Sequence, residues 1–194
     1  MASDLEQSSK KGRVGKSTRV LVMGIPNVGK SSFINKIAKR STAQVGNKPG
    51  VTKQKQWIKV SNNIELLDTP GVLWPKFENQ RVALSLSYIG TIKDEILELT
   101  EVTFFLVKFM LKNYRKNIIE RYSLEENQIK QIMEQEKNEN EKIYEVMELI
   151  GRKRGTIFSG GNIDEEKLSK LILQDFRSGK LGKISIEKVE EYGE

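Results

Sequence analysis

The residues best suited to chemistry lie between Gly24 and Ser31, where Gly-Ile-Pro-Asn-Val-Gly-Lys-Ser has the spacing of a phosphate-binding loop. Such a loop binds phosphate mainly through backbone N–H groups, at the N-terminus of the helix that follows. Lys30 can reach the β- and γ-phosphates of a nucleotide, and the Ser31 hydroxyl can bind Mg²⁺. The residues of this stretch predicted to contact the nucleotide are Pro26, Asn27, Val28, Gly29, Lys30, Ser31 and Ser32.

A second candidate group is Asp68-Thr69-Pro70-Gly71, which ends an apolar run. An aspartate in this position can hold Mg²⁺ through its water shell, and the Gly71 N–H can bind the γ-phosphate. Thr52 lies between the two motifs, where a switch threonine would complete the Mg²⁺ shell. An ordinary turn is the alternative for Asp-Thr-Pro-Gly alone. The candidate catalytic residues are Lys30 and Thr52, and the candidate Mg²⁺ ligands are Ser31, Thr52 and Asp68.

These side chains need a strand before the loop and a helix after it, and the sequence predicts both. Residues 20–23 form a short apolar, β-leaning run, and apolar residues recur at helical spacing within a helix predicted over residues 30–39. Two further β-leaning runs, residues 54–60 and 64–67, flank a turn-like Ser-Asn-Asn and predict an antiparallel hairpin. A chance match in a glycine-containing turn is the alternative to a true phosphate loop, and these flanks argue against it.

From about residue 80 the sequence changes to helical patterns. Residues 96–111 predict a buried helix, whereas residues 125–142 predict a solvated helix or a flexible connection. The basic residues 152–154 predict a loop that touches phosphates or a solvated turn. The predicted fold class is α/β, a partial P-loop NTPase (Rossmann-like) sheet followed by an all-α C-terminal domain. The predicted parts are a polar, basic linker or remnant helix (1–17), a P-loop portion (18–80) and a helical domain (81–194).

The composition narrows the functional classes further. The 194 residues include no cysteine and no histidine, which excludes disulfides, thiolate metal sites and histidine acid–base catalysis. The polar N-terminus lacks a signal-peptide pattern and no apolar run reaches bilayer length, so we expect a cytoplasmic protein without membrane contact. Residues 1–80 hold 14 Lys and Arg against 5 Asp and Glu, which gives +9 within a chain total of +7. This charge indicates a polyanionic partner such as RNA, or else a generic basic surface.

Taken together, the motifs closely resemble the YlqF/RbgA family, ribosome biogenesis GTPase A. The resemblance rests on G-I-P-N-V-G-K-S-S, P-G-V-T, L-L-D-T-P-G-V-L-W-P-K-F and I-G-R-K-R-G, and it covers roughly residues 18–185. It implies a circularly permuted P-loop GTPase that uses GTP and Mg²⁺ in late assembly of the large ribosomal subunit. It also implies binding of ribosomal RNA, with help from the C-terminal helical domain. We expect the chain to be a monomer.

The sequence departs from the family pattern in the base-binding and water-orienting residues. Guanine selection needs Asn-Lys-x-Asp, and neither Asn35-Lys36 nor Asn47-Lys48 is followed by that aspartate, so we expect an N-terminally truncated member. Ras-like enzymes carry a water-orienting Gln shortly after the glycine of this motif. In this chain Val72 follows Gly71, and its side chain cannot orient water. Asn27 resembles the K⁺-binding asparagine of cation-activated GTPases, or is a simple turn residue. We therefore expect a GTPase with weak or no hydrolysis in this isolated chain; the alternatives are an RNA-binding module that no longer turns over nucleotide, and an ATPase.

Overall fold

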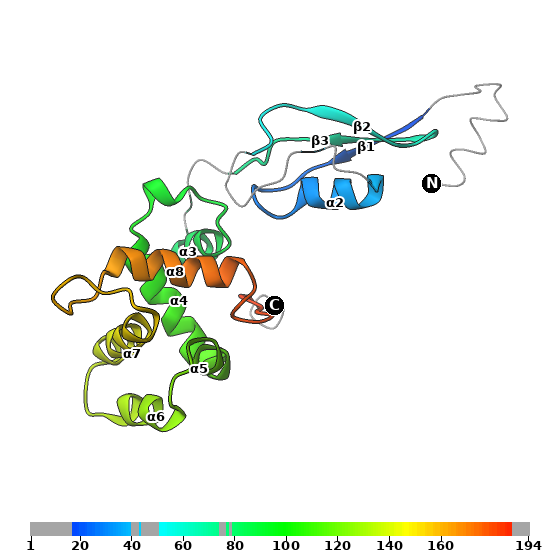
Figure 1. Ribbon diagram of the computed structural model, residues 1–194. Helices are drawn as coiled ribbons and strands as arrows, with labels where there is room; N and C mark the ends of the chain where they lie inside the picture. Colours follow the sequence, from blue (N-terminus) through cyan, green and yellow to red (C-terminus); the bar gives the residue numbers. More distant parts are fainter. Residues whose placement is uncertain (1–16, 40–42, 44–50, 74–76, 78, 188–194) are drawn as a thin grey trace, which may run out of the picture. The chain divides into compact units, whose positions relative to one another are not determined.

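The computed structural model describes residues 17–39, 43, 51–73, 77 and 79–187, and these form two units (Figure 1). One unit comprises Met1–Lys76 and Gly90–Ile92, and the other comprises Phe77–Ile89 and Lys93–Glu194. Within the described residues, the first unit contains a sheet and a helix, the second is helical, and each has its own hydrophobic core. The predicted α/β fold class is confirmed.

The sheet of the first unit has three strands in the order β1-β3-β2, which are Thr18–Val22 (β1), Ile64–Asp68 (β3) and Gln56–Ser61 (β2). β1 and β3 are parallel, and Val22 is level with Asp68. The loop that follows β1 and the aspartate that ends β3 therefore lie at the same end of the sheet, where both strands finish. β2 and β3 pair antiparallel, which confirms the predicted hairpin.

Helix α2, Lys30–Ala38, lies along one face of this sheet (Figure 1). Its residue Ile34 is fully buried in a small core with Ala43, Ile58 and Leu66. Full burial of such a side chain stabilises the fold by roughly 1.5–3 kcal/mol. This packing fixes the helix against the strands and so positions the loop at its N-terminus.

Several large apolar side chains of the first unit remain exposed. The exposed fractions are 51% for Leu21, 72% for Met23 and 57% for Phe33. In the described part of the chain, β1 pairs only with β3 and is an edge strand. An edge strand beside exposed apolar side chains favours association with further polypeptide.

The helices of the second unit pack around α4, Leu99–Asn113. α4 contacts α3, α5, α7 and α8, and Leu106, Val107 and Met110 are at most 1% exposed. A helix that is apolar on most sides needs such a central position. The other elements are α3 (Gln80–Tyr88), η1 (Asp94–Ile96), α5 (Arg115–Tyr122), α6 (Glu126–Glu134), α7 (Glu139–Arg154) and α8 (Glu165–Arg177).

Two predictions for this region are wrong. Residues 125–142 are not merely solvated, because α6 buries Ile129 and Ile132 in the main core. Residues 152–154 do not form a loop but the last turn of α7, which ends at Gly155 in the left-handed conformation (φ 68°). Cations in this position are favoured by the partial negative charge at a helix C-terminus.

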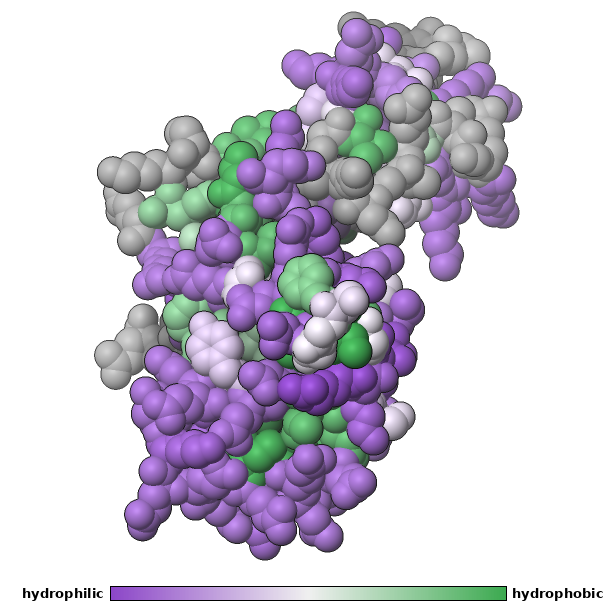
Figure 2. All heavy atoms as spheres, turned by 60° about the vertical axis from the view of Figure 1, so that its left-hand side comes forward, coloured by the Kyte–Doolittle hydropathy of each residue, from purple (hydrophilic) through white to green (hydrophobic). Residues whose placement is uncertain are grey.

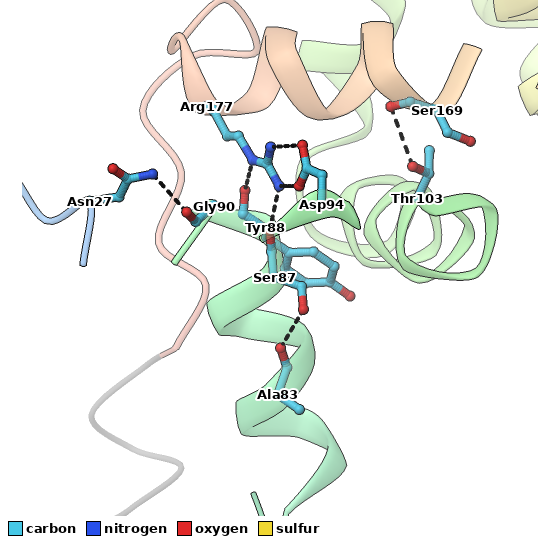
Figure 3. A network of polar contacts seen from close by, with 9 residues as sticks. All are labelled: Asn27, Ala83, Ser87, Tyr88, Gly90, Asp94, Thr103, Ser169 and Arg177. Carbon is cyan, nitrogen blue, oxygen red and sulfur yellow. Dashed lines mark hydrogen bonds and ion pairs between the residues drawn. The ribbon is translucent and has the colours of Figure 1, made fainter. Parts of the chain in front are cut away.

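A polar network ties α8 to the end of α3 and to η1 (Figure 3). The Arg177 guanidinium donates to both carboxylate oxygens of Asp94 at 2.8 Å. It also donates to the backbone carbonyls of Ser87 at 2.9 Å and Tyr88 at 3.1 Å. Arg177 therefore satisfies two carbonyls in the last turn of α3, which a helix alone leaves without partners.

Candidate nucleotide-binding site

The phosphate loop connects β1 to α2 with an unusual backbone. Gly29 is the N-cap of α2 and is left-handed at φ 89° and ψ 17°. Asn27 also has a positive φ, 60°, which asparagine adopts more readily than most residues. The Phe33 N–H donates to the Gly29 carbonyl at 2.8 Å, so helical bonding begins directly at the loop. The loop therefore ends on a helix N-terminus, which is the geometry that favours anion binding.

The Lys30 side chain curls back over the loop. Its Nζ donates to the backbone carbonyl of Ile25 at 2.8 Å. Burial lowers the pKa of Lys30, and the charge of Asp68 acts in the opposite direction. The ammonium group is therefore held beside the loop, and the negative charge of Asp68 favours its protonated form.

The three predicted Mg²⁺ ligands lie together beside the C-terminal ends of β1 and β3. Ser31 Oγ donates to Asp68 Oδ2 at 2.9 Å and lies 3.0 Å from Thr52 Oγ1. Parallel pairing of β1 and β3 explains this proximity, because both strands end at the same edge. The structure thus brings together residues that are 21 and 37 positions apart in the sequence.

The donor set fits Mg²⁺. Mg²⁺ in nucleotide sites is held by one or two carboxylates together with hydroxyls, phosphates and waters. Asp68 is fully buried, and its Oδ1 has no hydrogen-bond partner among the described residues. A buried carboxylate oxygen without a partner is costly unless a cation or a donor meets it. The described residues contain no cluster of three or more His, Cys, Asp or Glu that would favour a different metal.

The segment after Asp68 lies against the phosphate loop. A Cβ on Gly71 would lie 2.5 Å from the Cα and N atoms of Pro26, so only glycine fits this position. The Val72 N–H donates to the Gly24 carbonyl at 3.3 Å, and Thr69 Oγ1 donates to the Val22 carbonyl at 2.8 Å. The two motifs are therefore joined by backbone contacts as well as by the Ser31–Asp68 hydrogen bond.

A third segment, which the sequence analysis missed, also holds the loop. Asn27 Nδ2 donates to the Gly90 carbonyl at 2.7 Å (Figure 3), and Thr91 Oγ1 donates to the Pro26 carbonyl at 3.1 Å. All four residues belong to the first unit. Gly90 and Thr91 match no motif, and their distance of more than 60 residues from the loop left no sequence signal for this contact.

The remaining predicted residues divide into exposed and structural positions. Val28 is 50% exposed and Ser32 is exposed, so neither side chain is held by the core. Asn35 Nδ2 donates to the Ala43 carbonyl at 2.8 Å, and the Ala43 N–H donates to Asn35 Oδ1 at 2.7 Å. Asn35 therefore anchors the chain after α2. Asn47-Lys48 lies outside the described residues.

A shallow apolar cavity of about 510 Å³ lies beside the loop and is distinct from the Ser31–Asp68–Thr52 group. Met23, Ile25, Val72 and Leu73 are among its lining residues. It offers neither a charged side chain nor a carboxylate among the described residues, so it is not the phosphate site. Its lining shows that the two motifs also share an apolar surface.

A glycine-containing loop on a parallel strand, a Ser–Asp pair and a closely apposed glycine make up the architecture of a P-loop nucleotide-binding protein. The chain belongs to the family of 50S ribosome-binding GTPases, whose sequence pattern matches residues 19–148. The predicted resemblance to ribosome biogenesis GTPase A is confirmed by the relatives. None of the helices in the described ranges has the length and apolarity needed to cross a membrane.

The relatives are longer than this chain. The ribosome biogenesis GTPase A of Bacillus cereus is 48% identical over 184 residues, which cover 95% of this chain and 58% of the relative. The protein of the same name from Bacillus licheniformis is 42% identical over 93% of this chain and 60% of the relative. This chain therefore spans about three fifths of the length of these relatives.

Two solved structures of YlqF from Thermotoga maritima are also similar. The GDP-bound structure has a TM-score of 0.58 and 25% identity, and the match covers 95% of this chain and 66% of that one. The GNP-bound structure has a TM-score of 0.54 and 26% identity, with 94% and 64% covered. The fold is therefore shared with a protein that was solved in two nucleotide states.

Proposed function

We propose that this chain binds GTP with Mg²⁺ and hydrolyses it as a factor in late assembly of the large ribosomal subunit. The observation that carries the proposal is the Ser31–Asp68–Thr52 group beside the phosphate loop, in a member of the 50S ribosome-binding GTPase family. The whole-length relatives are named as ribosome biogenesis GTPases, which supports the same role here. In this role the chain would act as a monomer on the large ribosomal subunit in the cytoplasm.

In the proposed mechanism, the protein positions and neutralises phosphates. Lys30 balances charge on the β- and γ-phosphates, and the Gly71 N–H binds the γ-phosphate. Ser31, Thr52 and Asp68 hold Mg²⁺, which when bound would neutralise charge that develops on the phosphate oxygens. Asp68 and Ser31 are already hydrogen-bonded to each other, so this ligand set needs little reorganisation.

We also propose that Asn27 contributes to a K⁺ site at the phosphate loop. Its Nδ2 donates to the Gly90 carbonyl, and the Oδ1 of the same amide is an oxygen of the kind that cations bind. A monovalent cation there would supply positive charge that other GTPases take from an arginine. The proposal predicts faster hydrolysis in K⁺ than in Na⁺.

A second candidate is an RNA-binding module whose nucleotide is not turned over. The observation that favours it is the residue after Gly71, because Val72 is apolar, 73% exposed, and unable to orient water. No described residue supplies the aspartate of Asn-Lys-x-Asp. The two candidates differ in hydrolysis, not in phosphate binding.

Competition binding on the full chain tests the proposal. Labelled GTP should be displaced by GTP and GDP, and chelation of Mg²⁺ should weaken GTP more than GDP. Without base contacts, ATP should compete within a few-fold of GTP. Ser31→Ala should abolish the effect of chelation, whereas Ser61→Ala, at the far end of β2, should not. Phosphate release with large ribosomal subunits then separates the candidates, because the second predicts none.

A further inference from the structure

One guanidinium holds both ends of the short segment that supports the phosphate loop. Arg177 donates to the carbonyls of Ser87 and Tyr88, where α3 ends, and to the Asp94 carboxylate, where η1 begins. These four residues belong to the second unit. The chain between them, residues 89–93, therefore leaves α3 and enters η1 at two points that the same side chain fixes (Figure 3).

The Arg177 side chain is largely withdrawn from water. Figure 2 shows hydrophilic residues over much of the second unit in that view, where a cation would stay hydrated. The side chain of Arg177 is only 19% exposed. Taking a cation out of water is unfavourable unless it is paired and hydrogen-bonded, and Arg177 compensates through its bonds with Asp94 and the two carbonyls. Its partners therefore determine its position.

The middle of the same segment holds the phosphate loop. The Gly90 carbonyl accepts from Asn27, and the Thr91 hydroxyl donates to the Pro26 carbonyl. Gly90 has a φ of 71°, in the left-handed region, so the chain turns sharply where it meets the loop. The side chain of Thr91 is buried. These contacts lie within the first unit.

The anchors and the loop contacts are only a few residues apart in the chain. One residue separates Tyr88 from Gly90, and two residues separate Thr91 from Asp94. Neighbouring Cα atoms are held about 3.8 Å apart, so such short connections can absorb little movement. A shift of either anchor is therefore passed along the backbone to the residues that hold the loop.

We infer that Arg177 is a positioning residue for the phosphate loop, and that it acts through the backbone of residues 87–94. It fixes the two ends of this segment, and the middle of the segment fixes the loop. A change in the helical unit that releases Arg177 from Asp94 would therefore loosen the loop and weaken nucleotide binding. The effect on the nucleotide rests on the proposed function, whereas the effect on the loop does not.

Amide hydrogen exchange of the nucleotide-free full chain tests the positioning directly. Arg177→Met removes the guanidinium and keeps a long side chain. Peptides covering residues 24–33 and 87–94 should then exchange about threefold faster or more. Asp94→Asn weakens the same anchor from the other side and should act in the same direction. The rings of Tyr88 and Phe176, 6.2 Å apart, still pack α3 against α8 in both variants.

The matched control is Arg121→Met. Arg121 donates to both carboxylate oxygens of Asp175 at 3.0 Å, so the variant breaks a similar pair in the same unit. None of its hydrogen bonds in the described part of the chain involves residues 87–94. Exchange over residues 24–33 should stay at the parent rate in this variant, even where the helical unit is destabilised.

A double-mutant cycle identifies the route. Thr91→Val keeps the shape of the side chain but removes the hydrogen bond to the Pro26 carbonyl. If Arg177 acts through this segment, Arg177→Met should accelerate exchange of the loop by a smaller factor in the Thr91→Val background than in the parent chain. Arg177→Lys retains the charge but not the planar fork, and should lie between the parent chain and Arg177→Met.

Binding of labelled GTP to the same variants measures the consequence for the nucleotide. Affinity should fall about threefold or more in Arg177→Met and remain within about twofold of the parent chain in Arg121→Met. A parent chain that bound no GTP would refute the proposed function and leave the exchange test intact, because that test uses no nucleotide.

The inference is overturned if exchange over residues 24–33 is unchanged in both Arg177→Met and Asp94→Asn, whatever happens over residues 87–94. It is also overturned if Arg121→Met accelerates exchange of the loop as much as Arg177→Met does, since the effect would then be a general loss of stability. Circular dichroism of each variant shows whether it is folded. If Arg177→Met is not, Arg177→Lys and Asp94→Asn decide the outcome.

Discussion

The Asn27 amide donates to the Gly90 carbonyl across 2.7 Å, and this contact holds the phosphate loop from the side (Figure 3). Thr91 adds a second hydrogen bond to the Pro26 carbonyl. Two consecutive loop residues are thus fixed by two consecutive residues that follow α3. The loop is positioned by this segment as well as by the strand and helix on either side of it.

Replacing Asn27 by glycine tests the proposed cation site. Glycine adopts the φ of 60° without strain, so Asn27→Gly removes the amide and its hydrogen bond to Gly90 without straining the backbone. We expect hydrolysis of GTP in KCl to fall to the rate in NaCl, measured as phosphate release by the full chain. An unchanged ratio of the two rates would leave Asn27 as a structural residue only.

Removing the Lys30 ammonium should weaken nucleotide binding. Charge-assisted contacts of this kind contribute roughly 1.5–3 kcal/mol, so Lys30→Ala should lower the affinity for GTP about tenfold or more. Lys36→Ala removes an exposed lysine from the same helix and serves as the control in the titration. Equal affinities for the two variants would contradict the phosphate-loop assignment.

A single methyl group at Gly71 should separate the two motifs. In Gly71→Ala the new Cβ would collide with the Pro26 backbone at 2.5 Å, so one of the two segments must move. Because the Gly71 N–H is proposed to bind the γ-phosphate, affinity for GTP should fall more than affinity for GDP. The control is Gly161→Ala, which strains the backbone at a φ of 86° but meets no atom within 4 Å, and so measures destabilisation away from the loop. A parallel loss for both nucleotides would mean that the collision only unfolds the site.

Asp175 should make the helical unit sensitive to acid. Burial raises the pKa of this carboxyl, but hydrogen bonds from Arg121 at 3.0 Å and the nearby Lys180 outweigh burial and bring the pKa below 3.8. The folded state therefore binds this proton less readily than the unfolded state. The resulting stabilisation is present above pH 3.8 and is lost as the pH falls through the lower folded pKa.

Denaturant unfolding at several pH values checks this expectation. Asp175→Asn should lower the free energy of unfolding by roughly 1.5–3 kcal/mol at neutral pH, the range for hydrogen bonds to charged groups. The difference from the parent chain should shrink below pH 3.8. Glu134→Gln, which alters only the exposed pair with Lys130, should change stability by less than about 1 kcal/mol. A difference that persists in acid would mean that packing, not charge, is lost.

The sequence predicted the parts that local rules determine. The loop between residues 24 and 31 and the hairpin of β2 and β3 follow from glycine spacing and turn chemistry. Parallel pairing of β1 and β3 then brings Ser31 to Asp68, because the loop that leads to Ser31 follows β1 and Asp68 ends β3 at the same end of the sheet. The proximity of the proposed Mg²⁺ ligands could therefore be expected from order along the chain alone.

Contacts between distant residues could not be predicted in this way. α6 contains many polar residues, and these obscured the i, i+3 spacing of its two buried isoleucines, Ile129 and Ile132. From the sequence alone, Arg177 would be expected to be a surface cation at the end of α8. In the structure it binds Asp94, which is 83 residues away. Arg177 carries no motif, because its role depends on which element packs beside it.

The segment Gly90–Ile92 belongs to the first unit, although residues of the second unit flank it on both sides. The chain therefore passes between the units three times. A recombination event that replaced everything after Lys76 with another helical segment would also remove the partners of Pro26 and Asn27. We expect that the helical unit is not a freely exchangeable cassette, and that successful chimaeras of such proteins keep these three residues from the same parent as the phosphate loop.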